Sequence, residues 1–299
     1  MRIGMGLDGG GTKTDCVLMD AGGRVLGRGR GGPSNPSRIG FDAARIGVLA
    51  AARAALREAG KQTENVTDVC AGLAGVGRSE NAERMRQELH EIFAGAKIEV
   101  CTDLDLALEA AGARAAIVLV AGTGSAAIGR DAAGRVARSG GYGPKKSDEG
   151  SAFAVGKSAV DAVQSAKDEN AGDLRERILE ELDVDTLDSV VGLAGEEADA
   201  VYPRVFPVIA NAADQGNEIA RKLLTDAAKS LAGLVAGVQE ELKLSGTQFA
   251  LGKTGGMIRS STFFEEILDT ELRQVAPQAK FEILRTPLAE VAARRALKL

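Results

Sequence analysis

The chain has 299 residues, of which 44% are hydrophobic and 26% are charged. This composition favours a folded protein of two domains and excludes a disordered one. The net charge of −5 and the lack of a basic, aromatic-rich stripe argue against nucleic-acid binding. The apolar runs are too short to cross a membrane, so we expect a cytoplasmic protein with a small-molecule partner.

Histidine and cysteine limit the chemistry further. The one histidine, His90, lies in a helical run, which excludes a Ser-His-Asp triad and a histidine-based metal site. The three cysteines, Cys16, Cys70 and Cys101, each fall in an expected strand and are predicted to be buried and reduced. Proton transfer is therefore assigned to a carboxylate or a lysine.

The first thirty residues predict a β-meander, in which three strands follow one another through tight turns. The segments are RIGMGLDGGG, TKTDCVLMD and RVLGRGRGG, and the second turn reads DAGGRV. Helices are then expected at 38–59 and 79–94, the second with Ser79 as its N-cap. They alternate with strands at 66–71 and 97–101, which is typical of an α/β fold.

The same meander returns in the second part of the chain as AAIVLVAGTG, SAAIGRD and RVARSGG. Its turn, DAAGRV, stands where the first copy has DAGGRV. Agreement in strand order, glycine placement and turn indicates two homologous α/β halves with a ligand-binding cleft between them. Further on, the pattern predicts helices and one strand. Residues 166–193 are polar and only weakly periodic, so no helix or strand is predicted there. The helices are expected at 150–163, 196–213, 218–242 and 287–299, and the strand at 248–252.

Two glycine-rich turns occupy equivalent places in the two copies. Without side chains, the backbone N–H groups of such a turn can approach an anion closely. Either turn alone could merely close a hairpin, but their pairing predicts that both bind nucleotide phosphates. The first consists of Gly9, Gly10, Gly11, Thr12 and Lys13, and the second of Gly122, Thr123, Gly124 and Ser125.

Gly252, Lys253 and Thr254 resemble the end of a Walker A loop. The first glycine of that motif would stand at position 247, which is a threonine, and residues 248–251 would themselves be the strand. We therefore reject a Walker A loop. The following pair, Gly255 and Gly256, precedes a helix expected to start near Met257 and better suits an adenine or ribose seat.

Three aspartates are candidates for the chemistry. Asp8 ends the first strand beside the first glycine turn, where it would repel phosphate unless Mg²⁺ lay between them; the alternative is an Asx-type turn residue. Asp103 follows the strand 97–101, so it can cap a helix and point into the cleft. Asp148 lies at an expected helix start, where the helix dipole favours acids whatever the function.

The chain resembles the BadF/BadG/BcrA/BcrD-type ATPases, and within them the N-acetylglucosamine and glucosamine kinases. The segments that carry the resemblance occur in the family's order: LDGGGTKTDCVL, GGPSNPSRIG, AGLAG, CTDLDLAL, AGTGSAAIGRDAAGRV, GGYGPKKSDEGSAFAVG and LGKTGGMIRS. The resemblance implies two ribonuclease H-like (actin-like ATPase) domains with a central cleft. Domains are expected at 1–114 and 115–286, with a helix at 287–299 that packs back on the first.

The resemblance also implies an ATP- and Mg²⁺-dependent kinase that phosphorylates the 6-hydroxyl of an amino sugar. Asp103 then corresponds to the aspartate that removes the proton from that hydroxyl. The two glycine turns correspond to the phosphate motifs, and Gly255 and Gly256 to the adenosine motif. The sugar-binding residues would be Asn35, Asp103, Gly141, Tyr142 and Asp148. Because members of this family often form dimers, a homodimer is also expected.

Departures from the family pattern leave the acceptor open. Tyr142 stands where the sugar kinases usually have tryptophan, and Lys145, Lys146 and Ser147 replace two apolar residues and a glycine. The lysines could face solvent or an acidic sugar, so an N-acetylmuramic acid type of acceptor remains an alternative. The family also includes activator ATPases of CoA-dependent dehydratases and reductases, which hold an iron–sulfur cluster through interface cysteines. A third alternative is a regulator that binds ATP or a sugar without turnover.

Overall fold

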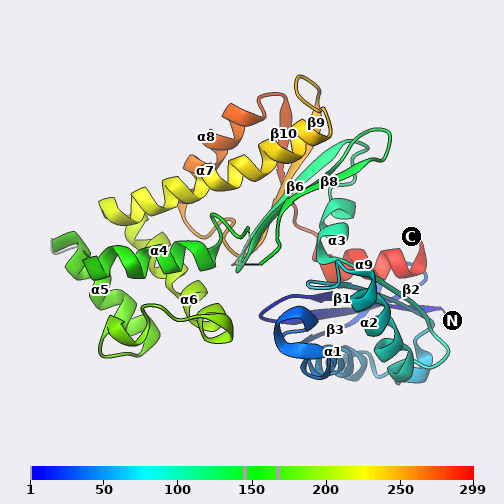
Figure 1. The fold of residues 1–299 in the computed structure, drawn as a ribbon. Coiled ribbons are helices and arrows are strands. Elements are labelled where there is room, and N and C mark those ends of the chain that lie inside the picture. The colour runs from blue at the N-terminus through cyan, green and yellow to red at the C-terminus, as the bar shows by residue number, and fades with distance from the viewer. Residues whose placement is uncertain (1, 144–146, 166–168) are drawn as a thin grey trace. The chain divides into compact units, whose positions relative to one another are not determined.

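The computed structural model describes residues 2–143, 147–165 and 169–299, and it divides into two compact units. Unit 1 comprises Met1–Ala110 and Arg285–Leu299, and unit 2 comprises Ala111–Leu284. Within the described residues each unit contains one five-stranded sheet with helices packed on it, which confirms the expected α/β class (Figure 1).

Unit 1 has the strand order β3-β2-β1-β4-β5. Its strands are antiparallel from β3 to β1 and parallel from β1 to β5. The elements are β1 (Ile3–Gly9), β2 (Thr14–Asp20), β3 (Val25–Gly31), α1 (Pro36–Ala59), η1 (Thr63–Asn65), β4 (Asp68–Leu73), α2 (Ser79–Ile92), β5 (Lys97–Cys101), α3 (Asp103–Ala110) and α9 (Leu288–Leu297).

The two faces of β1 pack against different helices because side chains alternate along a strand. Ile3, Met5 and Leu7 are buried in the cluster that includes residues of α1 and α2. On the other face, α9 approaches the strand so closely that Cβ atoms on Gly4 and Gly6 would clash with it. A Cβ on Gly6 would lie 2.1 Å from the carbonyl oxygen of Ala289. The last helix of the chain is thus fitted to the first strand.

Unit 2 has the strand order β10-β9-β6-β7-β8. Its α7 packs on β6, β7 and β8, and α4, α5, α6 and α8 complete one large core. The elements are β6 (Ala116–Ala121), β7 (Ser125–Arg130), β8 (Val136–Gly140), α4 (Ala152–Ser165), α5 (Glu169–Leu182), η2 (Leu187–Ser189), α6 (Gly195–Asp214), α7 (Glu218–Glu241), β9 (Phe249–Thr254), α8 (Thr262–Val275) and β10 (Ala279–Ile283).

The repeated meander has the same hydrogen bonds in both units. In the DAGGRV turn, Asp20 Oδ1 accepts from the backbone N–H groups of Gly22 and Arg24, at 3.0 Å each. In DAAGRV, Asp131 Oδ1 accepts from the N–H groups of Ala133 and Arg135, at 2.9 Å each. In each turn the arginine side chain also forms an ion pair with the aspartate. The residue directly before the arginine is a glycine with positive φ, Gly23 or Gly134. The turn residues identified in the sequence are therefore the ones that shape both hairpins.

Several expected elements differ from the observed ones. Arg78, not Ser79, is the N-cap of α2, and its side chain makes no capping hydrogen bond. The helix expected to follow Gly256 at once begins only at Thr262, where Ser261 Oγ accepts from the N–H of Phe264. Residues 166–193, left mostly unassigned, contain α5 and η2. Of the three free cysteines, Cys16 and Cys70 are buried as expected, but Cys101 is only half-buried.

Candidate functional site

The first glycine turn is held by backbone hydrogen bonds around a compact loop. The N–H of Gly10 donates to the carbonyl of Lys13 at 2.9 Å, and the N–H of Ser34 donates to the carbonyl of Gly10 at 3.0 Å. Beneath the turn, the hydroxyl oxygens of the buried Thr14 and Ser34 lie 2.7 Å apart. A Cβ on Gly9 would lie 2.1 Å from Ser34 Oγ, so glycine is required there.

Three cations, Lys13, Arg30 and Arg38, lie near this turn. Lys13 Nζ pairs with Asp15 Oδ2 at 2.6 Å, and Arg30 Nε pairs with Asp15 Oδ1 at 2.7 Å. The guanidinium of Arg38, a residue that the sequence did not single out, lies over Gly11: a Cβ there would be 2.8 Å from Nη1. Arg38 packs on a glycine 27 positions earlier because of where α1 lies in the fold, and no local sequence pattern predicts this contact.

Asp8 and Asp103, on different elements of unit 1, interact electrostatically. Asp8 lies within β1, in register with Asp15 of β2, and is therefore a strand residue and not a turn residue. Burial, followed by repulsion from Asp103 and Asp15, raises its pKa from 3.8 to about 7, and Lys13 opposes the shift. A divalent cation or a proton would relieve the repulsion between the buried Asp8 carboxylate and Asp103.

Thr102 and Asp105 form the cap at the start of α3. The N–H and hydroxyl of Thr102 both donate to Asp105 Oδ2, at 2.9 and 2.7 Å, and the N–H of Asp105 donates back to Thr102 Oγ1 at 3.1 Å. This reciprocal pattern is a capping box, so Thr102 and not Asp103 caps the helix. Asp103 is the first residue of the helix.

Asn35 is the N-cap of α1, and its side chain accepts from the N–H of Ser37 at 3.1 Å. A Cβ on Gly75 would lie 2.0 Å from Asn35 Oδ1, so the loop after β4 runs directly against this amide. The Ser37 hydroxyl and the Asn81 amide both donate to the Gly75 carbonyl, at 2.8 and 2.9 Å. The structure thus places Asn35 in a fixed position beside the loop at the end of β4.

The second glycine turn has the same backbone plan in unit 2. The N–H of Gly122 donates to the carbonyl of Gly124 at 2.9 Å, and the carbonyl of Gly122 accepts from Ala152 at the start of α4, also at 2.9 Å. Ser125 is 3% exposed, and its hydroxyl donates to the carbonyl of Glu149 at 2.7 Å. A Cβ on Gly124 would lie 3.0 Å from Asp148 Oδ2. The turn therefore brings Asp148 next to Gly124.

The predicted adenosine glycines lie against this second turn. The N–H of Met257 donates to the carbonyl of Ala121 at 3.0 Å. Gly255 has a φ of +111°, and a Cβ there would lie 2.2 Å from the Ala121 carbonyl oxygen. A Cβ on Gly122 would lie 3.6 Å from the backbone nitrogen of Gly256. Two glycine-rich segments far apart in the sequence thus form one side-chain-free surface.

These contacts predict a sharp contrast between neighbouring glycines. Gly255→Ala would force a Cβ into the Ala121 carbonyl in a left-handed conformation, so we expect a lower melting temperature and an ATP KM raised about tenfold or more. Gly256→Ala is the matched control for stability, because a Cβ there meets no protein atom within 4 Å. Thermal melts of both variants, with ATP titrations of Gly255→Ala, check this; equal losses of melting temperature at both positions would contradict it.

Tyr142 and Gly141 belong to a loop that follows β8. The N–H of Tyr142 donates to Ser147 Oγ at 2.9 Å, and the N–H of Ser147 donates to the carbonyl of Gly143 at 3.1 Å. The Tyr142 side chain is 60% exposed and stacks on the guanidinium of Arg138, whose Cζ lies 4.7 Å from the ring centroid. Lys145 and Lys146, for which the sequence left two interpretations, lie outside the described residues.

Lys253 is buried in β9, and its ammonium pairs with Asp269 of α8. A Walker A lysine would instead project from a loop to nucleotide phosphates. The structure therefore agrees with the rejection of that motif. The ion pair ties α8 to the sheet of unit 2.

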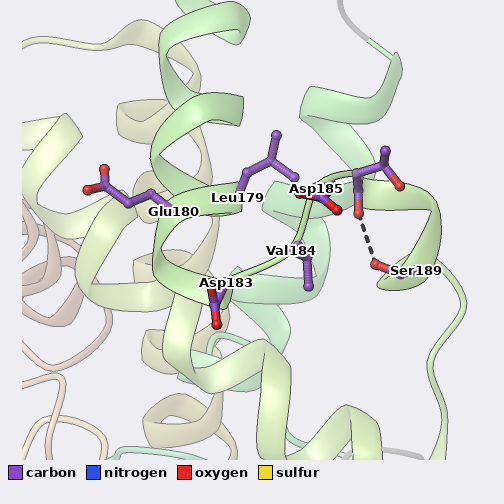
Figure 2. A pocket seen from close by; sticks show the side chains of 7 residues that line it. Leu179, Glu180, Asp183, Val184, Asp185 and Ser189 are labelled. Carbon is purple, nitrogen blue, oxygen red and sulfur yellow. Dashed lines mark hydrogen bonds between the residues drawn. The ribbon is translucent and has the colours of Figure 1, made fainter.

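A shallow hollow at the end of α5 lies apart from the predicted site residues, none of which lines it. Figure 2 shows Leu179, Val184, Asp183 and Asp185 around it, with the Ser189 hydroxyl donating to the Thr186 carbonyl at 2.9 Å. Its acids do not form a metal site, since the described residues contain no group of three or more histidine, cysteine or acidic residues able to hold a metal ion. None of the described helices is long and apolar enough to cross a membrane.

Two units of equal strand order, each with a glycine turn after its first meander strand, define a duplicated α/β fold of the ribonuclease H-like, actin-like ATPase class. The crystal structure of a candidate N-acetylglucosamine kinase from Chromobacterium violaceum has this fold, with a TM-score of 0.76 and 23% identity over 99% of both chains. The chain belongs to the BadF/BadG/BcrA/BcrD ATPase family, whose model matches residues 5–292.

Two curated relatives are similar over nearly their whole length. An N-acetyl-D-glucosamine kinase of Dictyostelium discoideum is 28% identical over 95% of this chain and 94% of its own. An N-acetylmuramic acid/N-acetylglucosamine kinase of Clostridium acetobutylicum is 27% identical over 94% of this chain and 93% of its own.

Proposed function

We propose that this protein is a cytoplasmic kinase that transfers the γ-phosphoryl group of ATP to the 6-hydroxyl of an amino sugar. The observation that carries the proposal is the pair of acids, Asp8 and Asp103, beside a glycine turn that recurs in unit 2. Both relatives bear the names of amino-sugar kinases. The reducing cytoplasm suits the three free thiols.

Each unit contributes a distinct part of the proposed reaction. In unit 2, the backbone of Gly122–Ser125 contacts ATP phosphates, and the surface formed by Gly255 and Gly256 seats the adenosine. In unit 1, the turn Gly9–Lys13 contacts phosphate. The residues proposed to bind the sugar are those that match the family's sugar-binding motifs: Asn35, Asp103, Gly141, Tyr142 and Asp148. These assignments rest on the family motifs and on the local contacts described above.

Phosphoryl transfer needs positioning and charge neutralisation more than covalent chemistry by the protein. Asp103 accepts the proton of the sugar 6-hydroxyl while the oxygen of that hydroxyl bonds to the γ-phosphorus of ATP. The bond between the γ-phosphorus and the β–γ bridging oxygen breaks, and ADP leaves. Asp8 fits a Mg²⁺ site, because the ion usually binds through one or two carboxylates and substrate phosphates. When bound, Mg²⁺ would neutralise charge on the phosphates.

A coupled ADP-release assay with Mg²⁺ and a panel of sugars tests the proposal. We expect turnover stimulated by N-acetylglucosamine or glucosamine, with N-acetylmuramic acid as the second candidate because the Clostridium relative's name includes it. The phosphorylated position is read from the product by NMR. No stimulation by any of these sugars would overturn the proposal and favour a non-catalytic regulator.

An iron assay separates the kinase from an activator ATPase. An activator needs cysteines that can reach a cluster at an interface. Cys16 and Cys70 are fully buried in β2 and β4. We expect anaerobically purified protein to contain no stoichiometric iron; one cluster per dimer would contradict the kinase assignment.

A further inference from the structure

The loop that carries Tyr142 is organised by one arginine, Arg138, in the middle of β8. Arg138 Nε donates to the carbonyl of Gly140 at 3.0 Å, and its Nη2 donates to the carbonyl of Gly141. The same guanidinium stacks on the Tyr142 ring. One side chain thus fixes two consecutive peptide groups and the aromatic side chain that follows them.

The backbone of this loop is shaped to receive the guanidinium. Gly140 and Gly141 both have positive φ, 77° and 75°, so two successive residues adopt a left-handed conformation that favours glycine. A Cβ on Gly141 would lie 2.5 Å from Arg138 Nη2 and 2.9 Å from the Cβ of Ala126. Glycine at this position is therefore required for the arginine to reach the main chain.

Stacking on Arg138 leaves Tyr142 as an exposed platform. Tyr142 is 60% exposed, although its ring lies against the Arg138 guanidinium and its backbone N–H donates to Ser147 Oγ. An aromatic face presents an apolar surface to the C–H groups of a ligand. An unconstrained tyrosine would lose rotamer freedom on binding, whereas this one is already held.

We infer that Arg138 is the positioning residue for acceptor binding: it holds Tyr142 and the Gly140–Gly141 carbonyls in the arrangement that receives the sugar ring. This inference rests on the proposed sugar kinase function for its kinetic test and on the structure alone for its spectroscopic test. Arg138 contacts the loop and not the reacting atoms, so its loss weakens acceptor binding more than the phosphoryl-transfer step.

Kinetics of Arg138→Lys test the inference with fold retained. Lysine keeps the charge but cannot donate to two carbonyls and stack on a ring at the same time. We expect the acceptor KM to rise about tenfold, with kcat and the ATP KM within about twofold of wild type. Arg130→Lys is the matched control, because Arg130 also donates to a backbone carbonyl, that of Ala113, outside the loop. Unchanged acceptor KM in Arg138→Lys, or the same rise in Arg130→Lys, would overturn the inference.

A double-mutant cycle shows whether Arg138 acts through Tyr142. Tyr142→Ala and Arg138→Ala should each raise the acceptor KM, and the double variant should resemble the more impaired single variant rather than multiply the two effects. Tyr142→Phe should retain most of the affinity, because the ring and its stacking remain. Fully multiplicative effects of Arg138→Ala and Tyr142→Ala would show that the two residues act independently.

Fluorine NMR gives a readout that needs no turnover. The chain has only two tyrosines and no tryptophan, so 3-fluorotyrosine labelling yields one exposed probe, Tyr142, and one buried probe, Tyr202. Arg138→Lys should shift and sharpen the Tyr142 signal and leave that of Tyr202 unchanged. If wild type phosphorylates no sugar, the proposed function fails while this result still decides whether Arg138 fixes Tyr142. An unshifted Tyr142 signal would overturn the positioning role.

Discussion

Asp103→Asn is expected to lower kcat for sugar phosphorylation by about 10² to 10⁴ while ATP affinity stays near that of wild type. Asparagine has nearly the shape of aspartate but cannot accept the proton of the acceptor hydroxyl. The loss should therefore appear in the chemical step. Steady-state kinetics with the sugar identified in the screen, together with calorimetric ATP binding, provide the measurement.

Asp105→Asn is the control for that experiment. Asp105 belongs to the same helix turn, but its carboxylate accepts from the N–H and hydroxyl of Thr102 and completes the capping box of α3. Its substitution by asparagine, which keeps an acceptor oxygen, should cost at most about 1 kcal/mol of stability, with a much smaller effect on kcat than Asp103→Asn. Equal kcat losses in both variants would mean that Asp103 acts through the helix and not as a base.

Asp8→Asn is expected to abolish most activity and yet stabilise the protein in the absence of nucleotide and Mg²⁺. The pKa of Asp8 is raised in the folded protein from 3.8 to about 7, so the ionised carboxylate disfavours folding. This penalty begins as the pH rises above 3.8 and is complete above about 7. Removal of this carboxylate should therefore raise the melting temperature more at pH 8 than at pH 5. The corresponding gain in the free energy of unfolding is at most roughly 4 kcal/mol.

Asp15→Asn should have the opposite effect on stability. Burial raises the pKa of Asp15, but hydrogen bonds and charge interactions with Arg30 and Lys13 outweigh it and hold the pKa below its ordinary value. A carboxyl whose pKa is lowered by folding stabilises the protein at pH values above its pKa in the unfolded chain. This stabilisation is lost as the pH falls through its pKa in the folded protein. Asp15→Asn should therefore lower the melting temperature at pH 8, and less so under acid conditions.

Ligand addition distinguishes the proposed metal role of Asp8 from simple strain relief. Mg²⁺ with an ATP analogue should raise the melting temperature of wild type more than that of Asp8→Asn, because the variant lacks the carboxylate that would hold the ion. Wild-type activity of Asp8→Asn would show that Asp8 is not needed for metal binding in the proposed site. A melting temperature below that of wild type at pH 8 would contradict the electrostatic account.

Local features of the sequence predicted most of the fold. The two meanders were visible because turn chemistry is local: an aspartate that bonds nearby N–H groups and a glycine with positive φ both act within five residues. By contrast, α5 was missed because it is rich in charged residues. Its buried face consists of Ala171, Leu174, Ile178 and Leu182, which lie on a helical period but are separated by polar residues.

Contacts between distant residues account for what the sequence could not reveal. The start of α8 is set by Ser261, whose hydroxyl also bonds Asp214 at the end of α6. Within the candidate site, the glycine turns and Asp103 could be proposed from the sequence because they stand at the ends of strands. Arg38 and Arg138 could not, because their roles come from packing on a turn and on a loop, and an arginine near a strand or helix end has no distinguishing pattern.

The packing of α9 on β1 has a consequence for biosynthesis. The glycine face of β1 is covered by a helix that is synthesised only after the whole of unit 2, and Val17 and Met19 of β2 are buried against the same helix. Unit 1 therefore keeps an open apolar face while unit 2 is synthesised and completes its own core. Removal of α9 would expose this face of unit 1 and leave the core of unit 2 intact.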